Sequence, residues 1–72
     1  MNYKTKAILQ LIKKKPGLNI VGICDEKENT LPVIDTGDAI FELEQDGHII
    51  RKHIAGPNYG YFITQKGLIE LI

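Results

Sequence analysis

Residues 30–47, TLPVIDTGDAIFELEQDG, form the stretch on which the fold of this chain depends. Thr30, Leu31 and Pro32 are typical of a helix N-cap and first turn, because the N–H that proline lacks would be unpaired there in any case. Gly47 can adopt the left-handed conformation that commonly ends a helix. The stretch therefore predicts a helix, in which Gly37 is expected to allow close packing against another backbone.

Helical periodicity divides the residues of this predicted helix into two sets. The apolar set, expected to face inward, is Val33, Ile34, Ala39, Ile40 and Leu43. The polar set, expected to face solvent, is Asp35, Asp38, Glu42 and Gln45. Paired carboxylates can act as general acid and base, but no His, Cys or Ser stands at a compatible spacing, so a solvated face is the simpler interpretation. The sequence also lacks a glycine-rich phosphate loop, and we expect no enzyme and no cofactor.

Charge is distributed unevenly along the chain, although its formal sum is zero. Residues 1–27 carry a net charge of +4, and residues 47–72 carry +2. Residues 28–46 carry −6 without a single Lys or Arg; their acids are Glu28, Asp35, Asp38, Glu42, Glu44 and Asp46. An acidic helix is a poor surface to lay against phosphates. The segregation indicates either solvated faces or a surface for a charged partner.

An amphipathic helix is predicted before this stretch, from Tyr3 to Lys15. Its apolar residues at helical spacing are Ala7, Ile8, Leu11 and Ile12. Asn2 or Thr5 can cap its start, and the pair Pro16–Gly17 ends it. Its last residues are the cations Lys13, Lys14 and Lys15. These lysines form either a solvated helix end that suits the helix dipole or a patch that contacts phosphates.

A second, shorter helix is predicted over residues 20–28, with Ile20, Val21, Ile23 and Cys24 as its apolar residues. Gly22 and the β-branched residues lower its helix propensity. The connection from this helix to the next is longer than a tight turn. Cys24 is the only cysteine, which excludes an internal disulfide and fits a reducing compartment. We expect it to be a small buried hydrophobe rather than a reactive thiol.

The last third of the chain has the pattern of a β-hairpin followed by a helix. The predicted strands are His48–Ile54 and Tyr61–Thr64, joined by a long loop, Ala55–Gly60. Thr64 is the predicted N-cap of a helix over residues 65–72. That helix has more apolar residues than one face needs, namely Leu68, Ile69, Leu71 and Ile72. Some are expected to pack on the first helix and the others to meet a second copy, giving a homodimer.

Length and composition set further limits. A chain of 72 residues holds one domain, and 43% hydrophobic with 25% charged residues is ordinary for a globular protein. No apolar run approaches the roughly 20 residues of a membrane span, so we expect a cytoplasmic protein that does not enter membranes. Cys24, His48 and His53 lack the paired spacing of a structural zinc site, and no metal is expected.

Two segments resemble parts of the winged helix-turn-helix superfamily. LEQDGHIIRK, Leu43–Lys52, is similar to the junction between helix and wing, where an acidic helix end, a glycine, an apolar pair and basic residues follow one another. YFITQKG, Tyr61–Gly67, is similar to the return strand and following helix of multiple-antibiotic-resistance-type and phenolic-acid-type repressors. The likeness covers essentially the whole chain. It implies an α+β domain of three helices, a β-hairpin wing and a short C-terminal helix.

The resemblance implies a third helix in the major groove of DNA and a wing against the neighbouring minor groove or backbone. The helix positions implied on this chain are Asp35, Thr36, Asp38, Ala39, Glu42 and Gln45. The wing positions implied are Arg51, Lys52, His53, Asn58 and Tyr59. The aromatic residues near Arg51, which are Tyr59, Tyr61 and Phe62, either pack within the hairpin or stack on bases, with Tyr59 in the predicted loop the best candidate for exposure.

Two functions follow as alternatives. The first is a DNA-binding regulator of transcription that acts as a dimer through its wing and its lysine cluster, that is through Arg51, Lys52, His53, Asn58, Tyr59, Lys13, Lys14 and Lys15. The second is a winged helix that has become a protein-interaction module. Its acidic third helix would use Asp35, Asp38, Glu42 and Gln45 to engage a basic partner or to imitate nucleic acid.

Overall fold

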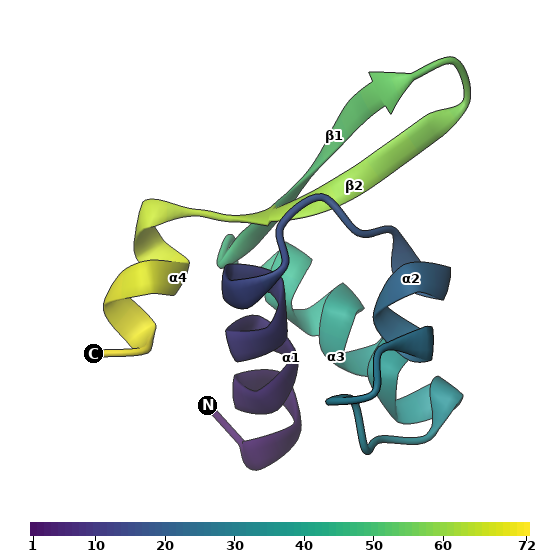
Figure 1. Ribbon diagram of the computed structural model, residues 1–72. Coiled ribbons are helices and arrows are strands. Elements are labelled where there is room, and N and C mark those ends of the chain that lie inside the picture. Colours follow the sequence, from purple (N-terminus) through teal and green to yellow (C-terminus); the bar gives the residue numbers. More distant parts are fainter.

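The computed structural model describes residues 1–72 and has an α+β fold of four helices and one two-stranded antiparallel sheet (Figure 1). The elements in chain order are α1 (Tyr3–Lys14), α2 (Ile20–Asp25), α3 (Val33–Gln45), β1 (Ile49–Ala55), β2 (Asn58–Ile63) and α4 (Gln65–Glu70). The α+β class and the order of elements agree with the sequence prediction. No helix has the length and apolar content needed to cross a bilayer.

Helix α1 begins at the first of its two candidate caps. The Asn2 side chain accepts a hydrogen bond from the Thr5 N–H at 2.9 Å, which pairs one of the donors that a helix start leaves free. The buried side of α1 consists of Thr5, Ile8, Leu9, Leu11 and Ile12. Leu9 is fully buried and Ala7 is exposed, which corrects the predicted apolar set. The buried side is broad because α1 contacts both α3 and β2.

Asn29 organises the connection between α2 and α3. Its amide nitrogen donates to the Ile23 carbonyl and to the Thr36 hydroxyl, both at 3.0 Å, and its amide oxygen accepts from the Leu31 N–H. Helix α2 ends at Asp25, earlier than predicted, and α3 begins after Pro32 without a side-chain cap. The prediction of Thr30 as an N-cap is therefore wrong. The side chain of Asn29, not that of Thr30, makes the hydrogen bonds of this turn.

Helix α3 is rotated relative to the prediction. Its buried residues are Thr36, Ala39, Ile40 and Leu43, whereas Val33 and Ile34 are 70% and 78% exposed. Thr36 replaces them on the inner side, and its hydroxyl donates to the Pro32 carbonyl at 3.1 Å, so that its burial leaves no unpaired donor. The nearest atom to a side chain added at Gly37 is the tip of Ile20, at 3.9 Å. The predicted close backbone contact at Gly37 is wrong.

The hairpin is tighter than predicted and projects past the three N-terminal helices (Figure 1). Its strands pair from Ile49 opposite Ile63 to Ala55 opposite Asn58, which leaves only the two residues Gly56 and Pro57 in the turn. Gly56 has a positive φ of 56°, which glycine adopts easily. Asn58 and the residues that follow it belong to β2, so the predicted six-residue loop is wrong.

The base of the hairpin is joined to the connection between α1 and α2. The Gly17 N–H donates to the Tyr61 carbonyl, and the Tyr61 N–H donates to the Leu18 carbonyl, both at 2.9 Å. These two bonds form a bridge like that of a very short third strand. Gly60 and Gly17 approach each other so closely that a Cβ on Gly60 would lie 2.6 Å from the Gly17 carbonyl carbon. The hairpin is therefore held by the backbone as well as by its contacts with the core.

Ten residues form the core: Ile8, Leu9, Leu11, Ile12, Ile23, Ala39, Ile40, Leu43, Ile49 and Tyr61. Thr64 caps α4 as predicted, since its hydroxyl accepts from the Gly67 N–H at 3.1 Å. Helix α4 lies beyond the base of the hairpin, on the side away from its tip, and packs mainly on β2 rather than on α1 (Figure 1). Leu68 and Ile69 of α4 and Ile72 after it are exposed.

Candidate nucleic-acid interface

The hairpin brings together all five residues predicted for the wing. Arg51, Lys52 and His53 are exposed on β1, and Asn58 is exposed at the start of β2. Successive side chains of a strand point to opposite faces, which places Arg51 and His53 on one face and Lys52 on the other. The cations are therefore available on both sides of a narrow two-stranded ribbon.

Aromatic side chains hold two of these cations. The guanidinium carbon of Arg51 lies 5.4 Å from the ring centre of Tyr59, and Lys52 Nζ lies 5.6 Å from that of Phe62. Such contacts contribute about 0.5–1 kcal/mol each at exposed sites and keep a charged group over the sheet. Tyr59 is half-buried in β2, not exposed in a loop, and meets Tyr61 edge-on at 5.7 Å. Of the two arrangements considered for these aromatic rings, packing within the hairpin is the one that the structure has.

Tyr61 connects this aromatic group to the core. It is 5% exposed and faces Arg51 across the two strands. Burial raises the pKa of its hydroxyl, and the neighbouring Tyr59 and Glu44 act in the same direction. Tyr61 therefore stays neutral at physiological pH and serves as the anchor of the ribbon rather than as a surface for stacking bases.

The hairpin has almost no negative charge of its own. No Asp or Glu occurs between residues 47 and 69. The nearest carboxylate on another element is Glu44 of α3, whose Oε2 lies 3.8 Å from Arg51 Nε. His53 Nε2 donates to the Gly56 carbonyl at 2.6 Å, which ties the imidazole to the turn. The exposed middle of β1 is therefore cationic, whereas residues 54–57 at the tip carry no charge.

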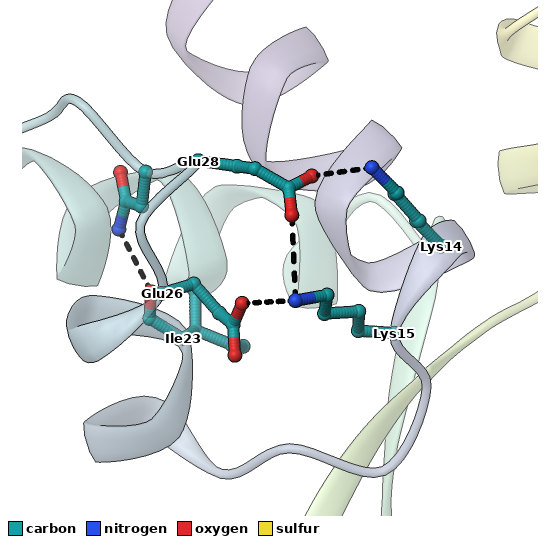
Figure 2. A network of polar contacts seen from close by, with 6 residues as sticks. Lys14, Lys15, Ile23, Glu26 and Glu28 are labelled. Atoms are coloured by element: carbon teal, nitrogen blue, oxygen red, sulfur yellow. Dashed lines mark hydrogen bonds and ion pairs between the residues drawn. The ribbon is translucent and has the colours of Figure 1, made fainter.

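The lysine cluster at the end of α1 is largely neutralised (Figure 2). Lys14 Nζ lies 2.8 Å from Glu28, and Lys15 Nζ lies 2.5 Å from Glu26 and 3.3 Å from Glu28. The hydrogen bond from Lys14 lowers the pKa of Glu28, and the bond to Glu26 raises the pKa of Lys15. Of the three lysines of the cluster, Lys13 alone has no carboxylate partner. Two carboxylates from the loop after α2 thus compete with any phosphate for this cluster.

Removing those two carboxylates should release the cluster. We expect Glu26→Gln with Glu28→Gln to raise the affinity for a random-sequence duplex and to steepen its salt dependence by as much as two units of slope, because each freed lysine can neutralise about one phosphate. Fluorescence anisotropy titrations across a range of salt concentrations measure both quantities. The matched control is Asp38→Asn with Glu42→Asn, which removes the same charge from α3. An equal gain in the control would mean that net charge, not the position of the lysines, causes the effect.

Helix α3 does not present the six groove-reading residues that the resemblance implies. Thr36 is fully buried and Ala39 is 4% exposed, so neither can contact a base. Asp35 is half-buried and pairs with Lys4, its Oδ1 lying 3.4 Å from Lys4 Nζ. Asp38, Glu42 and Gln45 are exposed as predicted. The exposed side of α3 therefore carries carboxylates and an amide, and no cation.

Three features of this surface were not predicted from the sequence. They are the bridge from residues 17 and 18 to Tyr61, the pairing of the lysines with Glu26 and Glu28, and the exposure of Phe41. Helical periodicity contains the signal for Phe41, which lies one turn from Asp38 and Gln45 on the polar side. The other two features join segments that are distant in sequence, and no local pattern reports them.

Cysteine and histidine do not combine into a further site. Cys24 is half-buried in α2, less enclosed than predicted. His48 is buried and His53 is exposed near the tip of the hairpin. No three His, Cys, Asp or Glu side chains converge as metal ligands would.

Comparison with known proteins adds no family to this description: no protein-family model matches the chain, and no curated protein gives a significant match.

Proposed function

We propose that this chain is a winged-helix DNA-binding domain, of the kind found in transcriptional regulators, that contacts double-stranded DNA chiefly through its hairpin. The observation that carries the proposal is a projecting two-stranded ribbon that has cations on both faces and no carboxylate of its own. The major groove of B-DNA admits a ribbon of this kind, and Arg or Lys on it can bind phosphates or guanine edges.

Two further observations support the winged-helix assignment. The order of three helices, a hairpin and a helix is compatible with that layout. Two backbone hydrogen bonds join Tyr61 to residues 17 and 18, in the connection between α1 and α2. This bridge makes the hairpin one body with the helices, so that a ribbon bound to DNA would also orient α1 and α3.

The charge of α3 determines how the domain would lie on DNA. Asp38 and Glu42 are exposed, and within a Debye length of about 8 Å at physiological salt they would repel the phosphates. The arrangement with the lowest electrostatic cost places the hairpin on the duplex and keeps the acidic side of α3 away from the groove. In this respect the proposed contact differs from that of a helix-turn-helix that reads bases with its third helix.

Salt dependence tests the proposal. We expect the protein to bind a fluorescent random-sequence duplex at about 50 mM salt and to lose at least tenfold in affinity at about 200 mM, because several phosphate contacts release counterions. A titration followed by anisotropy measures this. Bovine serum albumin, a protein without a basic ribbon, is a suitable control for non-specific changes in anisotropy. Absence of binding at the lower salt concentration would refute the proposal.

A further inference from the structure

The exposed side of α3 has a composition that DNA binding through the hairpin leaves unexplained. Phe41 is 64% exposed, and Ile34 is 78% exposed on the same helix. Asp38 lies between them, and Glu42 and Gln45 flank Phe41. Ile34, Asp38, Phe41 and Gln45 recur at intervals of three or four residues, and helical geometry therefore aligns them in one stripe. This stripe, Ile34–Asp38–Phe41–Gln45 with Glu42 beside it, is called the α3 stripe below.

Two hollows lie along the α3 stripe, and Phe41 and Gln45 line both of them. The first, of about 450 Å³, lies between the start of α1 and α3 and is bordered by Asp38 and Glu42. The second, of about 500 Å³, lies between α3 and the hairpin, with Ile20, Ile40 and Tyr61 among its lining residues. Phe41 thus borders both an acidic hollow and one whose lining includes the apolar residues Ile20 and Ile40. Such an alternation suits a ligand that has both apolar and basic groups.

The charged residues around the first hollow are predominantly negative, whereas the second hollow is bordered by one carboxylate and one cation, Glu44 and Arg51. The only cation in the first hollow, Lys4, is paired with Asp35, and the only cation in the second, Arg51, lies near Glu44. Asp38 and Glu42 have no cation partner. Nucleic acid and anionic lipid would both be repelled here, whereas Lys and Arg side chains would be attracted.

A second copy of the chain is a poor occupant. Its exposed apolar side chains at the C-terminal end are Leu68 and Ile69 of α4 and Ile72 after it, and the one cation of that helix is Lys66. Lys66 Nζ is already bonded to the Asp46 carbonyl at 2.6 Å. The α4 surface therefore offers apolar groups without the positive charge that Asp38 and Glu42 require.

We propose that the α3 stripe docks a basic amphipathic helix of a partner protein. Apolar side chains of the partner pack on Phe41 and Ile34 and into the hollow next to Tyr61, and its Lys or Arg side chains pair with Asp38 and Glu42. Recognition of a helix by apolar anchors one turn apart, with charges at the rim, is a common mode of peptide binding. The stripe itself contains none of the hairpin cations, although Arg51 of β1 borders the hollow next to Tyr61.

The test uses a synthetic probe and matched variants. The probe is a fluorescein-labelled helical peptide of Leu and Lys, in which Leu recurs every three or four residues; a second peptide has Glu in place of Lys. We expect anisotropy titrations to show binding of the Lys peptide only. Phe41→Ala should weaken that binding at least about tenfold, as truncation of a central aromatic anchor does. Asp38→Lys with Glu42→Lys should abolish it.

Two control variants show whether loss of peptide binding comes from the α3 stripe or from any change of an exposed aromatic residue or charge, and circular dichroism shows whether each variant is folded. Tyr3→Ala removes an aromatic residue that is 72% exposed on α1, and Asp25→Lys reverses an exposed charge at the end of α2. Both should leave peptide affinity unchanged, and all variants should keep the wild-type circular dichroism spectrum. Equal binding of the two peptides, or an equal loss in Phe41→Ala and Tyr3→Ala, would overturn the proposal. Self-association of the chain that Phe41→Ala abolishes, measured by sedimentation equilibrium, would overturn it in favour of a second copy.

Discussion

Replacing Arg51 and Lys52 together with alanine should reduce the affinity for a random-sequence duplex by about 100-fold at about 50 mM salt. Counterion release gives the plot of log K against log salt a slope of about −0.9 for each neutralised phosphate. Two phosphate contacts therefore account for a factor of roughly 100 in the binding constant at this salt concentration. The slope of log K against log salt should flatten by about two units. Both side chains are exposed on β1 and outside the core, and their contacts with Tyr59 and Phe62 contribute about 0.5–1 kcal/mol each, so a circular dichroism spectrum is used to show that the variant remains folded.

The control for this variant changes the same charge elsewhere. Lys6 and Lys27 are exposed lysines on the helical part of the molecule, outside the hairpin. Their joint replacement with alanine should leave the slope at its wild-type value. If the control loses as much affinity as the hairpin variant, binding depends on net charge alone and the hairpin is not the contact. A hairpin variant with an unchanged slope would lead to the same conclusion.

Replacing Gly60 with alanine should lower the free energy of unfolding by about 3 kcal/mol, a large loss for a domain of this size. A Cβ at this position would overlap the Gly17 backbone, which cannot move aside as a flexible side chain can. The overlap would break the bridge in which Gly17 and Leu18 bond to Tyr61. The melting temperature should fall by more than about 10 °C.

Gly37→Ala is the matched control for Gly60→Ala. A Cβ on Gly37 meets only the tip of Ile20 at 3.9 Å, an ordinary van der Waals distance. Alanine is a better helix former than glycine, so this variant should gain about 0.5–1 kcal/mol. Urea unfolding followed by circular dichroism measures both changes, with similar m-values if the folded states are equally compact. A Gly60→Ala midpoint equal to that of the wild type would show that the contact between the two glycines is not a constraint.

Gly60→Ala and the double variant of Arg51 and Lys52 both change the hairpin, the first its attachment and the second its charge. Gly60→Ala would detach the ribbon from the helices, whereas the Arg51 and Lys52 variant leaves the ribbon in place and removes its charge. If DNA binding requires a fixed ribbon, Gly60→Ala should also weaken binding under conditions in which the protein remains folded. The hairpin is thus both the part of the molecule that is proposed to bind and the part whose attachment is most sensitive to a single methyl group.

Local signals in the sequence predicted the elements of this fold well. Asn2 and Thr64 cap α1 and α4, and Gly47, with a φ of 78°, ends the turn after α3. Caps and glycine turns act over three or four residues, so the residues that form them stand next to one another in the sequence. The change of period after Gly47 likewise marked the hairpin. Arg51, Lys52 and His53, which the resemblance implied as wing positions, are exposed on β1.

By itself, then, the sequence determined the order of helices and strands, the acidic character of α3 and the cationic hairpin, because each of these depends on residues close together in the chain. The tertiary structure alone decided which side of α3 is buried, with Thr36 inside and Ile34 outside, since that depends on where α1 and α2 lie. It also decided that Glu26 and Glu28 neutralise lysines 11 and 14 positions away. Finally, it brought Gly17 against Gly60. Contacts between distant segments form only when the helices pack, and no local pattern of residues encodes them.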